Sequence, residues 1–224
     1  MQQKLRLVLF DCDGTLVDSA LVIQNAMNNV FDKFSYKTPS FDEIRNIIGL
    51  SLDVAISRLL QRPVDDEINA MVSSFKQNFS NGIDDIPLQE PLFPGIRDLL
   101  SKLEVREDIL LGVVTGKSRR GIDKICEAYK LKCFVTIKTA DDCPSKPNPA
   151  MVLESCSETG VLPSDTYVVG DTLYDMQMAK QAGARAIGVS WGYHTTDALM
   201  QAGAEVVLNE PVELLNLLGI ENHA

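Results

Sequence analysis

Histidine is scarce in this sequence: His194 and His223 are the only two among 224 residues. Catalytic triads and metal sites built on several histidines are therefore excluded. Cysteine occurs five times, an odd number with no Cys-x-x-Cys pair, so we expect reduced thiols in a cytoplasmic protein and neither a disulfide framework nor a zinc ribbon. Long hydrophobic runs are missing as well, since no stretch approaches the roughly 18 apolar residues of a membrane span.

Positive charge is also in short supply. There are 21 basic against 31 acidic residues, which gives a formal net charge of −10. Binding to a nucleic acid or to an anionic membrane requires clustered Lys and Arg, so neither is an expected partner. The hydrophobic share of 45% is that of an ordinary globular protein, and the length suits one large domain or a core with a small insertion.

What the sequence does contain is a series of short apolar runs separated by helical patterns. Strands buried on both faces consist of continuous Val, Ile and Leu, and their alternation with helices is typical of an α/β fold with a doubly wound parallel sheet. The predicted strands span residues 5–10, 110–114, 134–137, 167–169, 186–189 and 206–208.

Residues 17–91 interrupt this alternation. Helical patterns over 20–34, 41–48, 52–60 and 65–79 follow the first strand, with no convincing strand among them. The chain would return to the sheet through Pro87, Pro91 and Pro94, whose fixed φ angles set the direction of the connector. We therefore expect an all-helical cap domain at 17–91, inserted into a core domain made of 1–16 and 92–224.

Two carboxylates follow the first predicted strand, in the sequence Asp11-Cys12-Asp13-Gly14-Thr15. Alternate residues leave a strand on the same side, so these like charges would lie close together and need neutralising. A divalent cation is the simplest candidate, although a polar turn at the end of a strand would also explain the pattern. Asp11 is suited to attack a phosphorus atom, and Asp13 is suited to protonate the leaving oxygen.

Polar motifs also follow three other predicted strands, and ligands bind at that edge of an open α/β sheet. Thr115 and Gly116 offer a hydroxyl and backbone N–H groups to phosphoryl oxygens, and Lys146 offers a positive charge. Asp171 would complete an all-oxygen Mg²⁺ site, and Asp175 would orient metal-bound waters or Lys146. Each motif alone has an ordinary structural explanation, and only their order and shared edge indicate phosphoryl transfer.

These motifs resemble those of the haloacid dehalogenase superfamily: DxDGT at Asp11 and Asp13, a Thr motif at Thr115, a lysine motif at Lys146 and GDxxxD at Asp171 and Asp175. The resemblance covers essentially the whole chain. It implies a Rossmann-like core, a mobile helical cap and Mg²⁺-dependent phosphoryl transfer through an aspartyl-phosphate on Asp11. It also implies that Asp11, the main-chain carbonyl of Asp13 and Asp171 hold the metal.

The resemblance also narrows the reaction. Dehalogenase and phosphonatase members lack a carboxylate at the position of Asp13, so hydrolysis of a small phosphorylated metabolite is favoured. Residues 93–95, 49–52 and 189–193 look like those of the phosphoglycolate phosphatase group, which makes 2-phosphoglycolate the best single prediction. Phosphosugar phosphatase, pyrophosphatase and phosphomutase activities remain alternatives, although Leu52 stands where mutases usually carry Arg. A catalytically idle regulator that binds metabolites is the alternative from another class.

The cap is expected to select the substrate. Its basic residues Arg45, Arg58 and Lys76 are candidate contacts for a substrate carboxylate, although a solvated charge on a helix is the more ordinary explanation of each. The loop at 49–51 is a candidate to face the active site, and a simple turn explains it almost as well. Trp191, Gly192 and Tyr193 are expected to pack near the last strand at the site.

Overall fold

The computed structural model describes residues 4–81 and 90–220, without the side chains of 78–81. Within these ranges six strands, all parallel to their neighbours, form one sheet in the order β3-β2-β1-β4-β5-β6. Every predicted strand is present, and each end lies within one residue of its predicted place. The strands are β1 (Arg6–Phe10), β2 (Ile109–Val114), β3 (Phe134–Lys138), β4 (Thr166–Gly170), β5 (Arg185–Val189) and β6 (Val206–Leu208).

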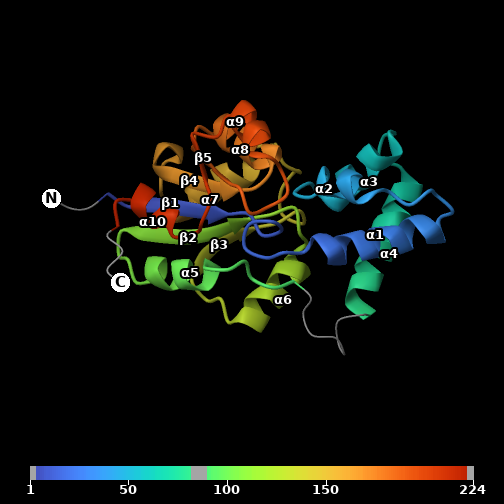
Figure 1. Cartoon of the computed structure of the whole chain (residues 1–224), viewed down its shortest axis with the longest axis horizontal. Coiled ribbons are helices and arrows are strands. Elements are labelled where there is room, and N and C mark those ends of the chain that lie inside the picture. The colour runs from blue at the N-terminus through green and yellow to red at the C-terminus, as the bar shows by residue number, and fades with distance from the viewer. Residues whose placement is uncertain (1–3, 82–89, 221–224) are drawn as a thin grey trace.

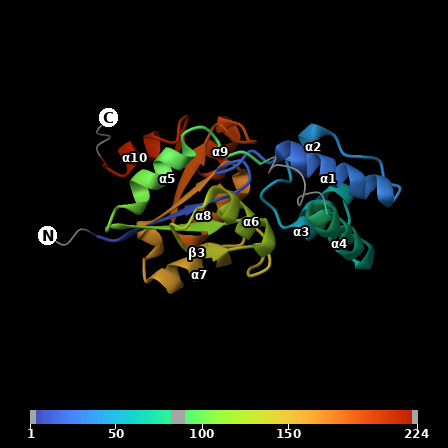
Figure 2. The ribbon, with the colours of Figure 1, turned by 90° about the horizontal axis from the view of Figure 1, so that it is seen from below.

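Helices cover both faces of this sheet (Figure 2). Successive strand side chains point to opposite faces, so Leu7 and Leu9 pack into one core, and Val8 and Phe10 pack into the other. The predicted doubly wound α/β fold is confirmed. One face carries α5 (Ile96–Glu104), α6 (Arg119–Tyr129) and α10 (Glu213–Leu217), and the other carries α7 (Ala150–Thr159), α8 (Leu173–Ala182) and α9 (Thr196–Ala202), with a short 3₁₀ turn, η1 (Pro163–Asp165), before β4.

Residues between β1 and α5 form a separate group of helices at one end of the sheet (Figure 1). They share a hydrophobic cluster that includes Met27, Val30, Ile56 and Met71. The helices are α1 (Ala20–Lys33), α2 (Phe41–Arg45), α3 (Leu52–Leu60) and α4 (Asp66–Asn81). The prediction for 41–48 was too long, because the chain turns after Arg45 and reaches Gly49 at a φ of +96°.

Two connectors join the helical group to the sheet, and they run side by side. The N–H of Asp18 donates to the carbonyl of Pro91 at 2.8 Å, and the N–H of Phe93 donates to the carbonyl of Leu16 at 3.0 Å. Val17 and Leu92 form an antiparallel bridge between them. Residues 82–89, including Pro87 of the predicted return, lie outside the described residues.

No helix in the described part of the chain combines the length and the hydropathy needed to cross a membrane. All five cysteines lie in described positions and are free thiols, as the sequence predicted.

Candidate active site

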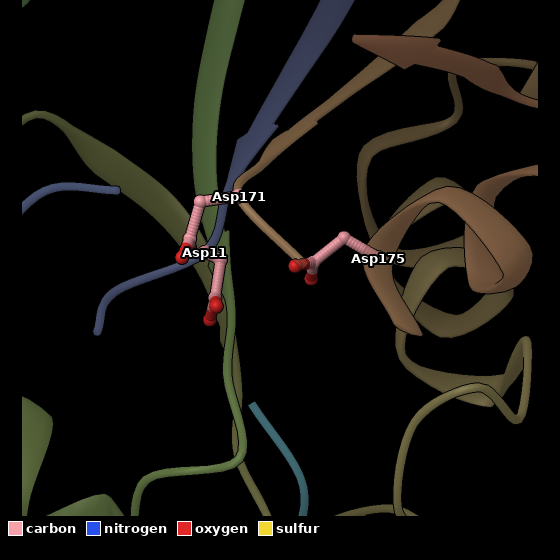
Figure 3. A group of neighbouring side chains, drawn as sticks. All are labelled: Asp11, Asp171 and Asp175. Atoms are coloured by element: carbon pink, nitrogen blue, oxygen red, sulfur yellow. The ribbon is translucent and has the colours of Figure 1, made fainter. Parts of the chain in front are cut away.

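Three buried carboxylates meet at the carboxyl edge of the sheet (Figure 3). Asp11 follows β1, Asp171 follows β4, and Asp175 lies in the first turn of α8. One oxygen of each lies within 4.8 Å of the others, and all three residues are fully buried. In Figure 3 the Asp175 side chain points from its helix toward the other two. The parallel strands thus bring together acids that are far apart in the sequence.

Asp171 is fixed from both sides of its carboxylate. The hydroxyl of Thr15 donates to Oδ1 at 2.9 Å, and the N–H of Tyr193 donates to Oδ2 at 2.9 Å. A Cβ on Gly14 would lie 2.2 Å from Asp171 Oδ2, and a Cβ on Gly192 would lie 2.2 Å from Asp171 Cβ. Only glycine at these two places leaves room for the carboxylate.

Lys146 supplies the positive charge of the cluster. Its Nζ lies 2.8 Å from Asp11 Oδ1 and 2.6 Å from Asp175 Oδ1. The other oxygen of Asp175 accepts hydrogen bonds from the N–H and the hydroxyl of Thr172, the N-cap residue of α8. Burial alone would lower the pKa of Lys146, but the two carboxylates raise it above its ordinary value. Lys146 is therefore a cation at neutral pH.

The cluster remains short of positive charge. Three carboxylates and one ammonium carry a formal charge of −2, and Oδ2 of Asp11 accepts no hydrogen bond from any described residue. Burial raises the pKa of Asp11 well above its ordinary value, and burial with the nearby Asp175 raises the pKa of Asp171 to about 7. A divalent cation would neutralise the excess, and Mg²⁺ prefers oxygen ligands of this kind. The residues present therefore fit a magnesium ion.

The carboxylate of Asp13 makes contacts that differ from those of Asp11. Its Oδ1 accepts a bond from Nζ of Lys117 at 2.9 Å, and the same Nζ donates to Oε1 of Glu90 at 2.7 Å. The carboxylate of Asp13 is not part of the acidic group formed by Asp11, Asp171 and Asp175. The expected role of its main-chain carbonyl as a metal ligand stays a prediction.

Thr115 and Gly116 lie between β2 and α6, beside the helical group. Thr115 is fully buried, and its Oγ1 accepts a hydrogen bond from the N–H of Lys117 at 3.1 Å. Since this bond uses a lone pair, the hydroxyl proton can still be donated to a phosphoryl oxygen. A Cβ on Gly116 would lie 2.5 Å from the carbonyl oxygen of Leu50, so the helical group contacts the sheet edge here.

A cavity of about 760 Å³ opens between the helical group and the sheet. Asp13, Gly116 and Lys117 line it on the sheet side. The helical group contributes mainly apolar side chains, among them Ile23, Met27, Ile47, Leu50, Val72 and Phe75. Asp11 and Lys146 are not among the described residues that line the cavity. The carboxylate cluster is thus screened from the cavity.

The basic residues of the helical group are placed differently from the sequence-based prediction. Arg45 donates to the carbonyl of Tyr193 at 2.6 Å, and Arg58 donates to the hydroxyl of Tyr174 at 2.7 Å. Both arginines thus bind groups of the sheet domain in this arrangement. Lys76 lines the cavity and pairs with Asp141 at 3.3 Å. The loop at 49–51 does face the site.

Several residues that shape the site were missed or undervalued in the sequence. Lys117 follows the Thr motif by two positions, and that spacing from a candidate phosphate-binding residue was the available signal. Glu90 and Thr15 gave no such signal. Residues 191–193 were expected to pack near the last strand at the site, and Trp191 and Tyr193 do pack against hydrophobic clusters. They also do more: the N–H of Tyr193 holds Asp171, and the indole N–H of Trp191 donates to the carbonyl of Thr15 at 3.1 Å.

Comparison with known proteins gives consistent matches. A family model described as "Haloacid dehalogenase-like hydrolase" matches residues 8–189. A Dickeya dadantii protein named "Probable phosphatase IndB" is 36% identical over 91% of this chain and 89% of its own. A Shigella dysenteriae protein named "Phosphoglycolate phosphatase" is 31% identical over 97% and 94%. The crystal structure of a hydrolase from Pseudomonas syringae superposes with a TM-score of 0.84 at 26% identity, covering 96% of this chain and 98% of that one.

Proposed function

Because this chain belongs to the haloacid dehalogenase-like hydrolase family, we propose that it hydrolyses a small phosphomonoester, with Asp11 as the nucleophile and Mg²⁺ as the cofactor. One observation carries the proposal. Asp11 is fully buried, Lys146 Nζ lies 2.8 Å from its Oδ1, and its Oδ2 accepts no hydrogen bond from the described residues. A carboxylate with lone pairs left open beside a fixed cation is suited to attack phosphorus.

In the first step, an Asp11 oxygen forms a bond to phosphorus, and the bond from phosphorus to the leaving oxygen breaks. Asp13 gives its proton to that oxygen, so the alcohol leaves neutral. The products are an aspartyl-phosphate on Asp11 and an ionised Asp13. Lys146 and the hydroxyl of Thr115 stabilise the charge that collects on the phosphoryl oxygens.

In the second step, water attacks phosphorus, and Asp13 takes a proton from this water. The bond from phosphorus to Asp11 breaks, which releases inorganic phosphate and restores the Asp11 carboxylate. Asp13 thus ends the cycle protonated, ready to act as the acid again.

The metal site of this proposal consists of Asp11, Asp171 and the main-chain carbonyl of Asp13, with Asp175 holding Lys146 beside it. When bound, Mg²⁺ supplies charge neutralisation and a fixed point for a phosphate oxygen. Thr15 and Tyr193 orient Asp171, and they determine where the metal would lie.

The proposal is tested with Asp11→Asn and a matched Asp123→Asn control, because Asp123 is exposed on α6. We expect the wild type and the control to release phosphate only with Mg²⁺ present, and Asp11→Asn to release none while melting normally. Mass spectrometry of acid-quenched wild-type protein should find one phosphoryl group on Asp11. Normal turnover by Asp11→Asn would refute its role as the nucleophile.

For the substrate we propose 2-phosphoglycolate as the first candidate. The relative from Shigella dysenteriae is named "Phosphoglycolate phosphatase". Residues 49–52, 93–95 and 189–193 of this chain look like those of the phosphoglycolate phosphatase group. Selectivity is measured as kcat/KM across phosphoglycolate, sugar phosphates, nucleotides and pyrophosphate. A preference for phosphoglycolate of tenfold or less, about 1.4 kcal/mol, would count against it.

A phosphorylated sugar is the second candidate, and the size of the cavity favours it. Pockets of about 300–1,000 Å³ bury most of a drug-sized ligand, and the cavity here measures about 760 Å³. A two-carbon leaving group would fill only a small part of it. The same kcat/KM series separates the two candidates.

We also propose that residues 17–91 act as a cap domain on a core made of 1–16 and 92–224, in a cytoplasmic setting that keeps the five thiols reduced. The paired connectors support a hinge at this boundary, since Asp18 and Phe93 each bond to the other connector. Because Asp11 is fully buried, the cap has to lift before a substrate can reach it.

A further inference from the structure

A single ammonium group joins two buried carboxylates beside the cavity. Nζ of Lys117 lies 2.9 Å from Asp13 Oδ1 and 2.7 Å from Glu90 Oε1. The three side chains are only 8%, 9% and 5% exposed, in the order Lys117, Asp13 and Glu90. Asp13 follows β1, Lys117 precedes α6, and Glu90 comes immediately before the second connector. Three separate segments of the core and hinge region thus converge on one nitrogen.

Each member of this triad is held in place by its own contacts. The N–H of Lys117 donates to Thr115 Oγ1, and a Cβ on Gly121 would lie 2.8 Å from Lys117 Cγ. The missing side chain at Gly121 therefore leaves the space that the lysine stem occupies. The carbonyl of Glu90 accepts a hydrogen bond from the hydroxyl of Tyr129 at 3.0 Å. The lysine and the glutamate are anchored to α6 at its two ends.

Because these three charged groups are buried, each of them depends on its charged partners. A buried charge that loses its partner has a large desolvation penalty, so Lys117 and its two carboxylates constrain one another's orientation. Glu90 competes with Asp13 for the same ammonium and fixes where that ammonium lies. Without Glu90 the long lysine side chain would lose one of the two carboxylates that fix its direction, and Asp13 could shift with it.

We propose that Glu90 and Lys117 are positioning residues that hold the carboxylate of Asp13 toward the leaving group. This proposal rests on the proposed function, in which Asp13 protonates the leaving oxygen. Lys117 contacts Asp13, and Glu90 acts through Lys117. Because Glu90 adjoins Pro91, whose carbonyl binds the first connector, the orientation of the acid is tied to the hinge of the cap.

The leaving group provides the test. Transfer of a proton matters greatly for an alkyl phosphate, whose alkoxide is a poor leaving group, and little for p-nitrophenyl phosphate, whose phenolate leaves unaided. We expect Glu90→Ala to lower kcat/KM on an alkyl phosphate by about tenfold or more and to change kcat/KM on p-nitrophenyl phosphate little. The ratio kcat/KM is compared because it covers the reaction only up to loss of the leaving group, whereas the second step, in which Asp13 acts on water, is the same for both substrates and contributes to kcat. Glu90→Gln keeps an oxygen that accepts from Lys117 and should restore most of the loss.

Glu104→Ala is the matched control, since Glu104 is exposed on α5, and it should change neither rate. An equal loss of kcat/KM on both substrates would indicate a general structural defect or a role of Lys117 in substrate binding, and it would overturn the proposal. So would an unchanged kcat/KM on the alkyl phosphate.

A crystal structure of Glu90→Ala gives a readout that does not need turnover. We expect the carboxylate of Asp13 to leave the position in which its Oδ1 lies 2.9 Å from Lys117 Nζ. An unmoved Asp13 would overturn the positioning role even if activity fell. If the wild type hydrolyses neither substrate, the proposed phosphatase function fails, and this structural comparison still decides whether Glu90 orients Asp13.

Discussion

Gly192 shows how much the site depends on the lack of a side chain. A Cβ at this position would lie 2.2 Å from Asp171 Cβ and 2.4 Å from its Oδ2. We expect Gly192→Ala to push the carboxylate out of place and to weaken Mg²⁺ binding by about ten- to 100-fold, as the loss of groups that orient metal ligands typically does. Isothermal titration with Mg²⁺ measures the change.

Gly160→Ala is the control for Gly192→Ala. Gly160 ends α7 at a φ of +73° with no atom within 4 Å of the added Cβ, so alanine there strains only the backbone. It should lower stability slightly and leave Mg²⁺ binding unchanged. Equal weakening of Mg²⁺ binding by both variants would contradict the steric explanation.

The titration of Asp171 predicts how metal binding responds to pH. Burial, reinforced by Asp175, raises its pKa to about 7, so Mg²⁺ must displace a proton below that pH. We expect the apparent dissociation constant for Mg²⁺ to fall about tenfold per pH unit as the pH rises from about 5 to about 7, and to level off above. A dissociation constant that does not change with pH would contradict this.

The stability of the metal-free protein should fall as the pH rises, whereas its affinity for Mg²⁺ should increase. The pKa of Asp171 in the folded protein, about 7, lies above its ordinary value of 3.8. Folding therefore favours the protonated acid, and this contribution is fully present below 3.8 and is lost as the pH rises through 7. We expect the melting temperature without Mg²⁺ to fall across this interval, and saturating Mg²⁺ to reduce the fall.

At this scale the sequence located Asp11, Asp171 and Lys146 because each follows a predicted strand, and parallel strands share one edge. Lys117 and Glu90 could not be paired in the same way. The partners of Lys117 are 104 and 27 residues away along the chain, and Glu90 belongs to no periodic pattern. Side-chain direction in a connector depends on contacts that only the folded chain provides.

Among the elements, α8 connects the stability of the fold to the geometry of the site through its N-cap residue, Thr172. Thr172 caps the helix and also donates from its hydroxyl and its N–H to Oδ2 of Asp175. We expect Thr172→Ala to destabilise the protein by about 2 kcal/mol, since it removes a cap and a hydrogen bond to a charged group. Thermal unfolding followed by circular dichroism should show a melting temperature lower by about 4–8 °C.

Thr195→Ala is the control for Thr172→Ala, because Thr195 caps α9 through Ala198 alone. It should have about half of that effect, near 1 kcal/mol, and no effect on phosphate release. Thr172→Ser keeps the hydroxyl and should resemble the wild type. A loss of stability in Thr195→Ala as large as in Thr172→Ala would contradict the special role of Thr172.

Strands were predicted to within a residue because burial on both faces leaves an unbroken apolar signal. The end of α2 was not, and a distant contact explains it. The hydroxyl of Tyr174 donates to the carbonyl of Asn46 at 2.7 Å, immediately after the helix ends. A residue 128 positions away thus donates to a backbone carbonyl that would otherwise accept a hydrogen bond within a longer helix.

For the whole molecule, the proposed division into cap and core predicts that the contacts between the two parts set how often the site opens. Arg58 donates to the hydroxyl of Tyr174, and its guanidinium lies 4.9 Å from the centre of that ring. Removal of this contact by Arg58→Ala should cost the docked arrangement about 1 kcal/mol. The N–H of Ser51 donates to the hydroxyl of Ser145 across the same interface at 2.8 Å, so its hydrogen exchange reports undocking. We expect that exchange to become about fivefold faster.

The control is Arg97→Ala. Arg97 lies over the ring of Tyr129, and both residues belong to helices that cover the sheet and not to the cap. The substitution removes a similar pair without touching the cap, and exchange at Ser51 should stay as in the wild type. The sequence could not anticipate this docking role. Basic residues on a helical insertion fit a substrate carboxylate as well as a tyrosine hydroxyl, and only the folded arrangement distinguishes the two.

Trp191 is the chain's single tryptophan, and it lies two hydrogen bonds from Asp171, the proposed metal ligand, through Thr15. Its indole emission therefore comes from one known place beside the site. A shift in emission as Mg²⁺ is added would follow occupancy directly, without a label and before any substrate is identified. The same signal recorded in a stopped-flow mixer would give the rate at which the ion enters.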